Sequence, residues 1–417
     1  MRIAILNKFL FQTGGPERYL ETVRAGLVAE GHQVGVAGIG YTDVGPETPG
    51  VVHRIPPRLP PGQYSLSGPT LTGTAKLRTA AATIFNVAAY RSMREFFTVW
   101  QPDVLYVLNY VNHLSASPIV AARRAGIPVA VRCSDYFFKC PKWTFFRDGH
   151  ECHDCSRNPL AAVRHRCVGQ SRLASTVRVA GMVTESSFGW LRDAEALIAP
   201  SQMMAQELLS YGASTDCIHV VPTPVSNTFF KAGREIRTGK RVLYVGRITE
   251  EKGLATLFRA ASRLPTDVEI RVAGDVSRRE ALDLCSNAPA NVTLLGRLTA
   301  NQVGEEICAA ACVVVPSLWP ENSPNSLLEA GAAGAAVIVS DAPTLVELVH
   351  HGKTGLVVPR GEPEPLAHAI MTLIQHPHLA GRLGLELQSN IAARHSLPVH
   401  LRKLVTIFSA ITKKRPA

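Results

Sequence analysis

The chain has 417 residues, 46% of them hydrophobic and 18% charged, which is the composition of a globular protein of about two or three domains. Lys and Arg outnumber Asp and Glu by 44 to 33, and this favours an acidic partner: a phosphorylated small molecule, an anionic membrane surface or nucleic acid. Neither a spanning apolar run nor a secretion signal is found. We therefore expect a cytoplasmic protein, with any membrane contact peripheral at the inner face.

The first strand, Arg2–Leu6, is followed by a polar turn, Asn7–Thr13, and a helix, Glu17–Glu30. Gly14 and Gly15 lie between turn and helix. Glycines at such a junction let a ligand approach the backbone, although a plain tight turn explains them equally well. The spacing is not that of the dinucleotide fingerprint, which argues against NAD or FAD.

Pro and Gly are frequent from Tyr41 to Thr74, which predicts an extended loop. A helix with basic residues is expected over Ala75–Phe97, either resting on anionic lipid or simply solvated on its charged face. Strand and helix then alternate through three further elements, Asp103–Leu108, Leu114–Ala125 and Pro128–Arg132.

An insertion over residues 139–168 contains four of the nine cysteines, Cys140, Cys152, Cys155 and Cys167. The Cys152–Cys155 pair has C-x-x-C spacing, so a structural zinc ion is one interpretation. Only one close pair is present, and separate thiols or a redox pair remain the alternatives.

Two strands and a helix complete the first half, Glu195–Ala199, Gln202–Tyr211 and Ile218–Val221, and Pro222–Gly239 is the expected linker. A second alternating series follows, with strands at 241–245, 269–273, 291–295, 313–315, 336–340 and 355–358. Strands separated by helices favour parallel units. We predict an α/β protein with two Rossmann-like doubly wound domains, residues 1–222 and 239–390, facing a cleft, with residues 391–417 as a C-terminal helix on the first domain.

Two groups of polar residues follow strands of the second domain. Arg247 comes directly after the first strand and Lys252 lies five residues later. Two cations beside a helix start suit a diphosphate, although a solvated helix start is sometimes basic too. Glu321 and Glu329 flank the second group, in which Pro324 suits the first position of a helix and Asn322 or Ser323 suits its cap. That helix start is a potential anion site.

Taken together, the ordered motifs resemble the retaining glycosyltransferases of family 4, which have the GT-B fold. The resemblance covers nearly the whole chain and is carried by Gly14–Gly15, Gly246–Arg247 with Lys252, Gly274–Asp275, Gly296, Pro316–Ser317, Glu321 to Glu329, Pro343 with Glu347, and Gly352 with Thr354–Gly355.

The resemblance implies a donor pocket. Arg247 and Lys252 would hold the donor diphosphate, assisted by backbone amides around Ser326 and Leu327. Glu329 would bind the ribose hydroxyls. Glu321 would meet the donor sugar, together with the amides of Asn322, Ser323 and Asn325. No metal ion is needed for transfer in this family.

One position departs from the family pattern. Many members place a His before an Asp after the strand at Pro128–Arg132, whereas this chain has Ser134 before Asp135. We list Glu321, Asp135 and Ser134 as catalytic candidates, and the substitution leaves the sugar's identity or the activity itself open.

We therefore expect a retaining transferase that moves a hexose from a UDP- or GDP-sugar to a glycan or lipid-linked acceptor in surface polysaccharide or glycoconjugate synthesis. The alternatives are a non-catalytic nucleotide-sugar-binding protein and an epimerase or phosphorylase on the same fold. Nucleic acid is not expected as a partner, because no aromatic residues are interleaved with the basic ones.

Overall fold

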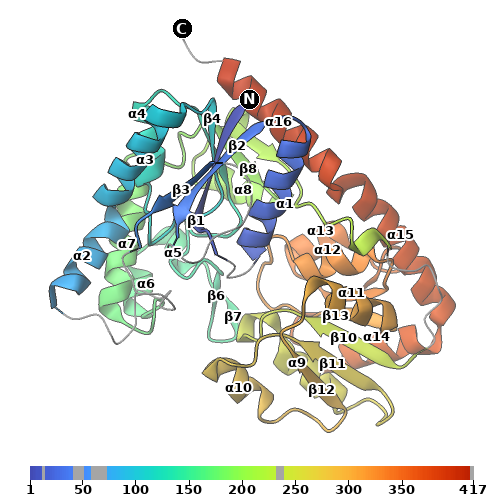
Figure 1. The fold of residues 1–417 in the computed structure, drawn as a ribbon. Helices are drawn as coiled ribbons and strands as arrows, with labels where there is room; N and C mark the ends of the chain where they lie inside the picture. The colour runs from blue at the N-terminus through green and yellow to red at the C-terminus, as the bar shows by residue number, and fades with distance from the viewer. Residues whose placement is uncertain (12–14, 41–50, 58–72, 232–238, 414–417) are drawn as a thin grey trace. The chain divides into compact units, whose positions relative to one another are not determined.

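The computed structural model describes residues 1–11, 15–40, 51–57, 73–231 and 239–413, in which two compact units are distinguished. Within the described ranges, unit 1 comprises Met1–Phe145, His153–Val221 and Leu401–Ala417, and unit 2 comprises Phe146–Cys152 and Pro222–His400. Each unit is built on a parallel β-sheet with helices beside it (Figure 1), so the predicted α/β class and the two Rossmann-like domains are confirmed.

The sheet of unit 1 has seven parallel strands in the order β3-β2-β1-β4-β5-β8-β9. The strands are β1 (Arg2–Phe9), β2 (Gln33–Ile39), β3 (Val51–Ile55), β4 (Val104–Val107), β5 (Val129–Arg132), β8 (Ala196–Ala199) and β9 (Ile218–Val220). Every residue of β4, β5 and β8 is buried, as expected for parallel strands covered on both faces. The chain order reverses between β1 and β4, which are neighbours in the sheet.

Helices cover both faces of this sheet, with α1 and α16 on one side and α3 and α4 on the other (Figure 1). The ring of Tyr106 on β4 lies 5.2 Å from that of Phe408 on α16, and its hydroxyl lies 2.6 Å from that of Tyr19 on α1. The helices of unit 1 are α1 (Gly15–Ala29), α2 (Gly73–Ile84), α3 (Val87–Trp100), α4 (Ser117–Arg124), α5 (Asp154–Arg157), α6 (Ala161–Arg164), α7 (Arg172–Ser187), α8 (Gln202–Ser210), the short 3-10 helix at Thr215–Cys217, and α16 (Leu397–Lys413), which begins in unit 2.

The strands near the N-terminus differ from the prediction in two places. Instead of turning at Asn7, β1 continues to Phe9, because the Asn7 side chain is fully buried and donates to the Phe9 carbonyl at 2.8 Å. Within the predicted loop Tyr41–Thr74, residues Val51–Ile55 form β3 and pair with β2. Residues 41–50 and 58–72 of that loop lie outside the described ranges.

The single helix predicted over Ala75–Phe97 is wrong, because two helices, α2 and α3, occupy this stretch and are separated at Asn86. The Asn86 side chain accepts from the Ala89 amide at 3.0 Å and donates to the His113 carbonyl at 2.7 Å. A capping asparagine that is also tied to a neighbouring loop starts a new helix. The basic residues therefore do not lie along one continuous amphipathic helix.

Unit 2 contains a six-stranded parallel sheet in the order β12-β11-β10-β13-β14-β15. Its strands are β10 (Arg241–Val245), β11 (Glu269–Ala273), β12 (Val292–Gly296), β13 (Cys312–Val315), β14 (Val337–Ser340) and β15 (Leu356–Val358), and a separate hairpin pairs β6 (Phe146–Arg147) with β7 (His150–Glu151). The chain order again reverses between neighbours, here β10 and β13.

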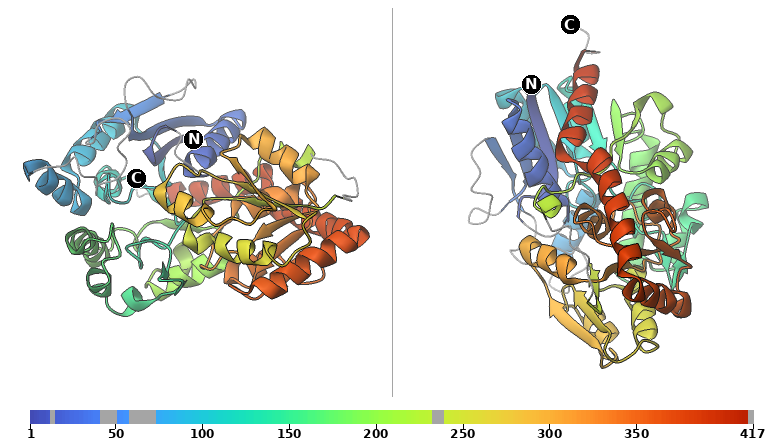
Figure 2. Two further views of the ribbon diagram at one scale, coloured as in Figure 1. Left: turned by 90° about the horizontal axis from the view of Figure 1, so that it is seen from below. Right: turned by 90° about the vertical axis from the view of Figure 1, so that its right-hand side faces the viewer.

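The two faces of this sheet carry separate hydrophobic cores, because side chains alternate along each strand. Ile338 belongs to the core shared with α9 and α14, whereas Val337 and Val339 belong to the core shared with α11 and α12. Figure 2 shows these helices on the two sides of the sheet. The helices are α9 (Leu254–Ala261), α10 (Arg279–Cys285), α11 (Ala300–Ala309), α12 (Asn325–Ala332), α13 (Pro343–Leu348), α14 (Pro363–Gln375), α15 (Pro377–His395) and two 3-10 turns, Phe229–Lys231 and Glu250–Lys252.

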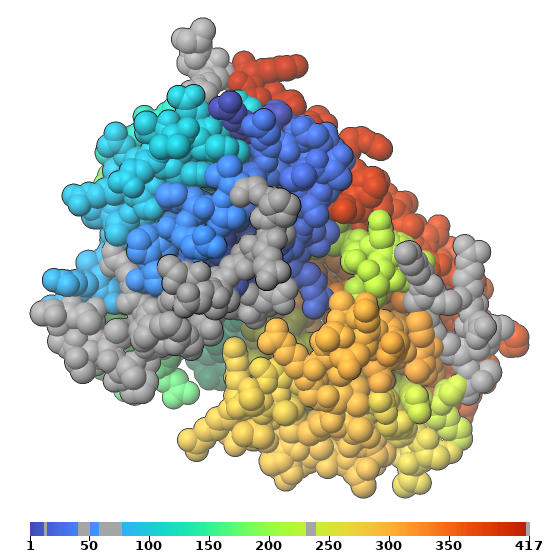
Figure 3. Space-filling model, in the orientation of Figure 1, coloured from blue at the N-terminus to red at the C-terminus, as the bar shows by residue number. Residues whose placement is uncertain are grey.

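The outer edge of the unit 2 sheet is exposed. Leu294 on β12 is 40% exposed and Leu282 on α10 is 56% exposed, and the yellow and orange atoms of this edge lie at the surface in Figure 3.

Among the described helices, none combines the length and the apolar character needed to cross a membrane.

The Asn86 cap gives a first prediction. Replacing Asn86 with Ala removes the acceptor for the Ala89 amide and leaves the half-buried His113 carbonyl without this donor, so we expect a loss of about 1–3 kcal/mol in the free energy of unfolding. Urea denaturation measures this. Val99→Ala in the same helix is the control: Val99 is 87% exposed, so this variant should change the free energy of unfolding by less than about 0.5 kcal/mol. Equal losses in the two variants would contradict the assignment of the cap.

Candidate functional site

The sequence-predicted cations and carboxylates of unit 2 lie at the point where its strand order reverses. In a sheet of this kind, ligands bind outside the carboxyl ends of the strands at such a switch point. Arg247 and Lys252 follow β10, and Glu321 follows β13, the strand beside it. The topology therefore brings together two groups that are about 70 residues apart in the sequence.

The two loops are packed backbone to backbone. Gly253 has a φ of +73°, and a Cβ atom there would lie 1.9 Å from the Pro316 carbonyl oxygen. In addition, the Leu318 amide donates to the Glu251 carbonyl at 2.9 Å. Because only glycine combines a positive φ with so close an approach, Gly253 fixes the distance between the loops.

Lys252 and Glu321 form a buried ion pair, with 2.6 Å between Nζ and Oε1. Their side chains are 17% and 4% exposed. The Ser317 hydroxyl donates to the same carboxylate oxygen at 2.6 Å, and the Lys252 ammonium lies 5.3 Å from the centre of the Trp319 ring. Glu321 is therefore paired with Lys252 in the protein without a ligand.

Arg247 presents the second cation and is the more accessible of the two, with 54% of its side chain exposed. Its Nη2 lies 3.3 Å from Oε1 of Glu251, which is itself nearly buried. The Arg247 carbonyl accepts a hydrogen bond from the Tyr244 hydroxyl at 2.7 Å. Burial raises the pKa of Tyr244, so this phenol stays neutral and keeps the proton that it donates.

Helix α12 begins at Asn325, one residue after the proline that was expected at its first position. Pro324 occupies the N-cap with extended backbone, not the first helical position, and no side chain caps the helix. The Ser323 hydroxyl instead donates to the Thr223 hydroxyl at 2.6 Å, so the expected cap by Asn322 or Ser323 is not formed. Asn325 and Ser326 are the first two residues of α12. Their backbone N–H groups have no acceptor within the helix, because no helical turn precedes them. The Leu327 amide already donates to the Pro324 carbonyl at 3.1 Å.

The remaining predicted residues of unit 2 are buried near the start of α12. Asn322 is 3% exposed in the loop before the helix, and Glu329 is 7% exposed on the helix itself. A buried carboxylate is expensive unless its oxygens are hydrogen-bonded. Asn322 and Glu329 thus place two polar side chains in a largely apolar surrounding.

The predicted residues of unit 1 are less completely described. Gly15 is the first residue of α1, whereas Gly14 lies outside the described ranges. Ser134 is exposed two residues after the end of β5. The neighbouring Asp135 carboxylate accepts from the Phe137 amide at 3.1 Å and so helps to shape its own loop.

The four cysteines of the insertion are the predicted ligands of a structural zinc ion. Among the residues with described positions, no three His, Cys, Asp or Glu side chains are grouped as ligands of a metal ion. Cys140 is buried, and burial raises the pKa of its thiol, which disfavours the thiolate that zinc needs. Cys155 lies on α5, and Cys152 and Cys167 are half-buried elsewhere in the insertion. The residues in this arrangement do not fit zinc, and the ion stays a prediction that metal analysis can test.

The sequence reasoning missed a buried polar network carried by α7. The Tyr110 hydroxyl donates to the Glu185 carboxylate, and Arg178 Nη2 donates to the Phe137 carbonyl at 2.7 Å. Burial raises the pKa of Glu185 and lowers that of Arg178. The network braces the loop that carries Ser134 and Asp135. Its sequence signal is weak, because Arg178 and Glu185 look like ordinary surface charges of a helix.

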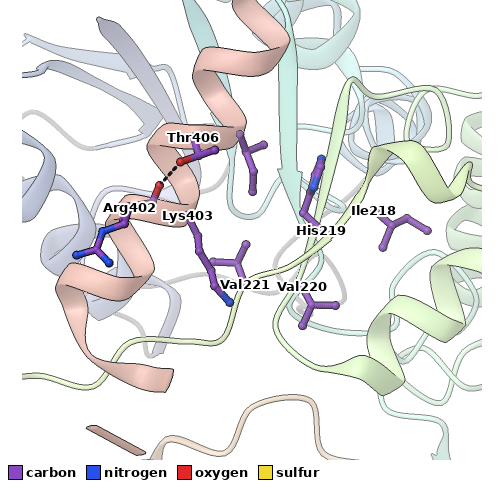
Figure 4. A pocket seen from close by; sticks show the side chains of 8 residues that line it. Ile218, His219, Val220, Val221, Arg402, Lys403 and Thr406 are labelled. Atoms are coloured by element: carbon purple, nitrogen blue, oxygen red, sulfur yellow. Dashed lines mark hydrogen bonds between the residues drawn. The ribbon is translucent and has the colours of Figure 1, made fainter. Parts of the chain in front are cut away.

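A separate groove of about 430 Å³ lies on unit 1, between the edge strand β9 and helix α16 (Figure 4). None of the residues predicted for the site contributes to it. It is lined by Ile218, His219, Val220, Val221, Arg402, Lys403, Thr406 and Ile407.

Comparison with known families identifies the class of protein. Residues 14–224 match the family model of the glycosyl transferase 4-like domain, and residues 239–376 match that of the glycosyl transferases group 1. The first match alone spans half of the chain. The chain therefore belongs to the glycosyltransferases of these two domain families.

Curated relatives match part of the chain. It is 32% identical over 222 residues to the alpha-maltose-1-phosphate synthase of Mycobacterium tuberculosis, a match that covers 46% of this chain and 57% of the relative. It is 30% identical over 176 residues to the alpha-D-kanosaminyltransferase of Streptomyces kanamyceticus, covering 41% and 45%. The chain thus spans about half the length of the curated relatives that it matches.

Solved structures match over nearly the full length. The sucrose-phosphate synthase of Thermosynechococcus elongatus has a TM-score of 0.71 at 18% identity, with 99% of both chains covered. HepE of Anabaena, in a crystal structure with UDP and glucose, has a TM-score of 0.68 at 17% identity, covering 98% of this chain and 99% of its own. At this identity the likeness shows the fold, which is GT-B.

The close approach at Gly253 generates the second prediction. We expect Gly253→Ala to lower the free energy of unfolding by clearly more than about 1–2 kcal/mol, the usual cost of a left-handed residue with a Cβ, because the new methyl group also meets the Pro316 carbonyl. Gly352 is a matched control, since its φ is also +73° and nothing lies within 4 Å of a Cβ there. Urea denaturation compares Gly253→Ala with Gly352→Ala. Equal losses would show that the two loops are not in contact.

Proposed function

We propose that the protein is a retaining glycosyltransferase that moves a hexose from a nucleoside diphosphate sugar to a glycan or lipid-linked acceptor, in surface polysaccharide or glycoconjugate synthesis. The observation that carries the proposal is the ion pair of Lys252 with the buried Glu321 at the β10–β13 switch point. Arg247 lies in the same loop as Lys252, and the buried Glu329 lies on the helix that follows Glu321. The UDP and glucose in the crystal structure of HepE support the choice of donor class.

In this proposal, the cations hold the donor. Arg247 engages diphosphate oxygens through its fork of N–H groups and Lys252 adds a point charge, while the Asn325 and Ser326 amides at the start of α12 add two uncharged donors. These groups stabilise the negative charge that develops on the leaving diphosphate. This electrostatic stabilisation is the main contribution of the protein to the rate. The scheme requires no metal ion.

The buried carboxylates hold the uncharged parts of the donor. Glu329 accepts hydrogen bonds from the ribose hydroxyls. Glu321 meets the sugar while it remains joined to Lys252, so the sugar and the diphosphate are positioned by one connected group. Apolar walls alone cannot make such contacts, because each buried hydroxyl then loses its partner in water.

The transfer step breaks the bond between the anomeric carbon and the diphosphate oxygen, and the acceptor oxygen forms its bond to that carbon on the same face. The acceptor proton passes to the departing diphosphate. The configuration at the anomeric carbon is thereby retained.

The transfer itself is tested by incubating the purified protein with UDP- and GDP-sugars and a panel of glycan and lipid-linked acceptors, and following nucleotide release. We expect release that depends on one donor and one class of acceptor. Absence of both binding and turnover with every donor would overturn the proposal.

A second candidate, a nucleotide-sugar-binding protein without catalysis, is favoured by one observation, the exposed Ser134 in place of the family His. Calorimetry that shows donor binding, with no transfer by the wild type or by the Ser134→His variant, would support it. Isomerisation of a free UDP-sugar without an acceptor would instead support an epimerase.

The assignment of the donor contacts gives the third prediction. We expect Arg247→Ala to weaken donor binding by tenfold or more in calorimetry, because a charged hydrogen bond contributes about 1.5–3 kcal/mol and 1.4 kcal/mol is a factor of ten. Arg241→Ala is the matched control: that side chain is 50% exposed, against 54% for Arg247, and lies at the opposite end of β10.

Glu329→Ala gives the fourth prediction, a similar loss of donor affinity with a folded protein by circular dichroism, because the ribose hydroxyls lose their acceptor. The measurement is the same titration. Wild-type affinity in both Arg247→Ala and Glu329→Ala would show that the donor binds elsewhere.

A further inference from the structure

Trp319 is a buried aromatic residue beside the ion pair of the candidate donor site. It lies in the loop after β13, two residues before Glu321, and is 6% exposed. The Lys252 ammonium lies 5.3 Å from the centre of its ring. A tryptophan between two prolines looks like an ordinary core residue in the sequence, so no motif indicates its place beside the site.

The indole N–H of Trp319 is an unusual feature. It is buried and has no hydrogen-bond partner in the described part of the chain. A buried donor without an acceptor destabilises a fold, and phenylalanine would fill much of the same space without that cost. The indole N–H therefore does not account for a tryptophan at this position, and the aromatic ring is the part that contacts the ion pair.

That property is the electrostatic attraction of the ring for a cation. An ammonium within about 6 Å of a ring centroid is attracted by the negative face of the ring, and tryptophan is the strongest of the aromatic partners. The attraction grows as the cation loses water, and the Lys252 side chain is only 17% exposed.

Lys252 is thus held by two different partners. A lysine has a flexible four-carbon stem, so one ion pair alone leaves its ammonium free to turn about the carboxylate. Glu321 contacts Nζ at 2.6 Å, and the Trp319 ring restricts it further. Together they define a single position for a charge that would otherwise sample several.

We propose that Trp319 is a positioning residue that fixes the Lys252 ammonium for the diphosphate of the donor. Trp319 touches neither the diphosphate nor the sugar in this account and acts only through Lys252. The inference rests on the proposed function for its ligand, but the contact between ring and ammonium is tested without any ligand.

The ligand-free test uses selective ¹³C labelling of lysine. We expect the Lys252 ε-methylene protons, assigned by their loss in Lys252→Met, to be shifted upfield by the ring current of Trp319. The shift should persist in Trp319→Phe and disappear in Trp319→Leu. An unshifted signal in the wild type would overturn the proposal, whether or not the protein is a transferase.

The ligand-binding test measures UDP and GDP affinity by calorimetry in the same variants. We expect the order wild type, Trp319→Phe, Trp319→Leu, with Trp319→Leu weaker than the wild type by about threefold to thirtyfold. Trp319→Phe should be at least as stable as the wild type in urea denaturation, because the unsatisfied N–H is gone. Affinity that simply follows stability across the variants would point to a merely structural role and would overturn the proposal.

A double-mutant comparison isolates the route through Lys252. In the Lys252→Met background, Trp319→Leu should change nucleotide affinity by less than twofold, since the charge that Trp319 holds is absent. A full effect of Trp319→Leu in that background would refute the proposal. If the wild type binds neither nucleotide, the donor assignment fails while the proton shift still decides the contact.

Discussion

The buried ion pair between Lys252 and Glu321 is the constraint on which the candidate site depends. Removing one partner of a buried pair leaves an uncompensated charge and typically costs about 3–5 kcal/mol. Both residues are therefore fixed in their loops, and the loops are held together by the approach of Gly253 to Pro316. The fold stabilises an arrangement of charges that a solvated pair of loops would not keep.

Because of this ion pair, the two cations of the site differ in mobility and exposure. The charge of Lys252 is balanced by the buried carboxylate of Glu321, whereas Arg247 is largely exposed beside Glu251. In the proposed function, the diphosphate of the donor would meet one cation that is fixed in place and one that is accessible. A charge that is already in place needs little rearrangement of the protein when a ligand binds. An exposed arginine can instead turn its planar guanidinium toward the oxygens of the ligand.

Much of the fold was predictable because strands of parallel sheets are apolar, short and regularly separated by helices. β10 and β11 occur over the residues predicted for them. The errors arose where local signals were overridden by long-range contacts. Asn7 is polar yet lies within β1, and Asn86 interrupts a run of helix-forming residues because the His113 loop binds its side chain.

The candidate site was predictable as a set of residues but not as a set of contacts. Motif spacing indicated Arg247, Lys252 and Glu321, yet nothing in the spacing predicts that Glu321 would bind Lys252. The unfilled cap of α12 and the role of Trp319 depend on side-chain directions, which a sequence pattern does not define. The same limit applies to the cysteines, whose spacing suggested a metal site that the described residues do not form.

The most direct test of the account is a crystal structure of the protein with a bound nucleoside diphosphate. The account predicts diphosphate oxygens within hydrogen-bond distance of Arg247 and Lys252, with the Lys252–Glu321 pair intact and the ribose at Glu329. A nucleotide bound away from the carboxyl ends of β10 and β13 would contradict it.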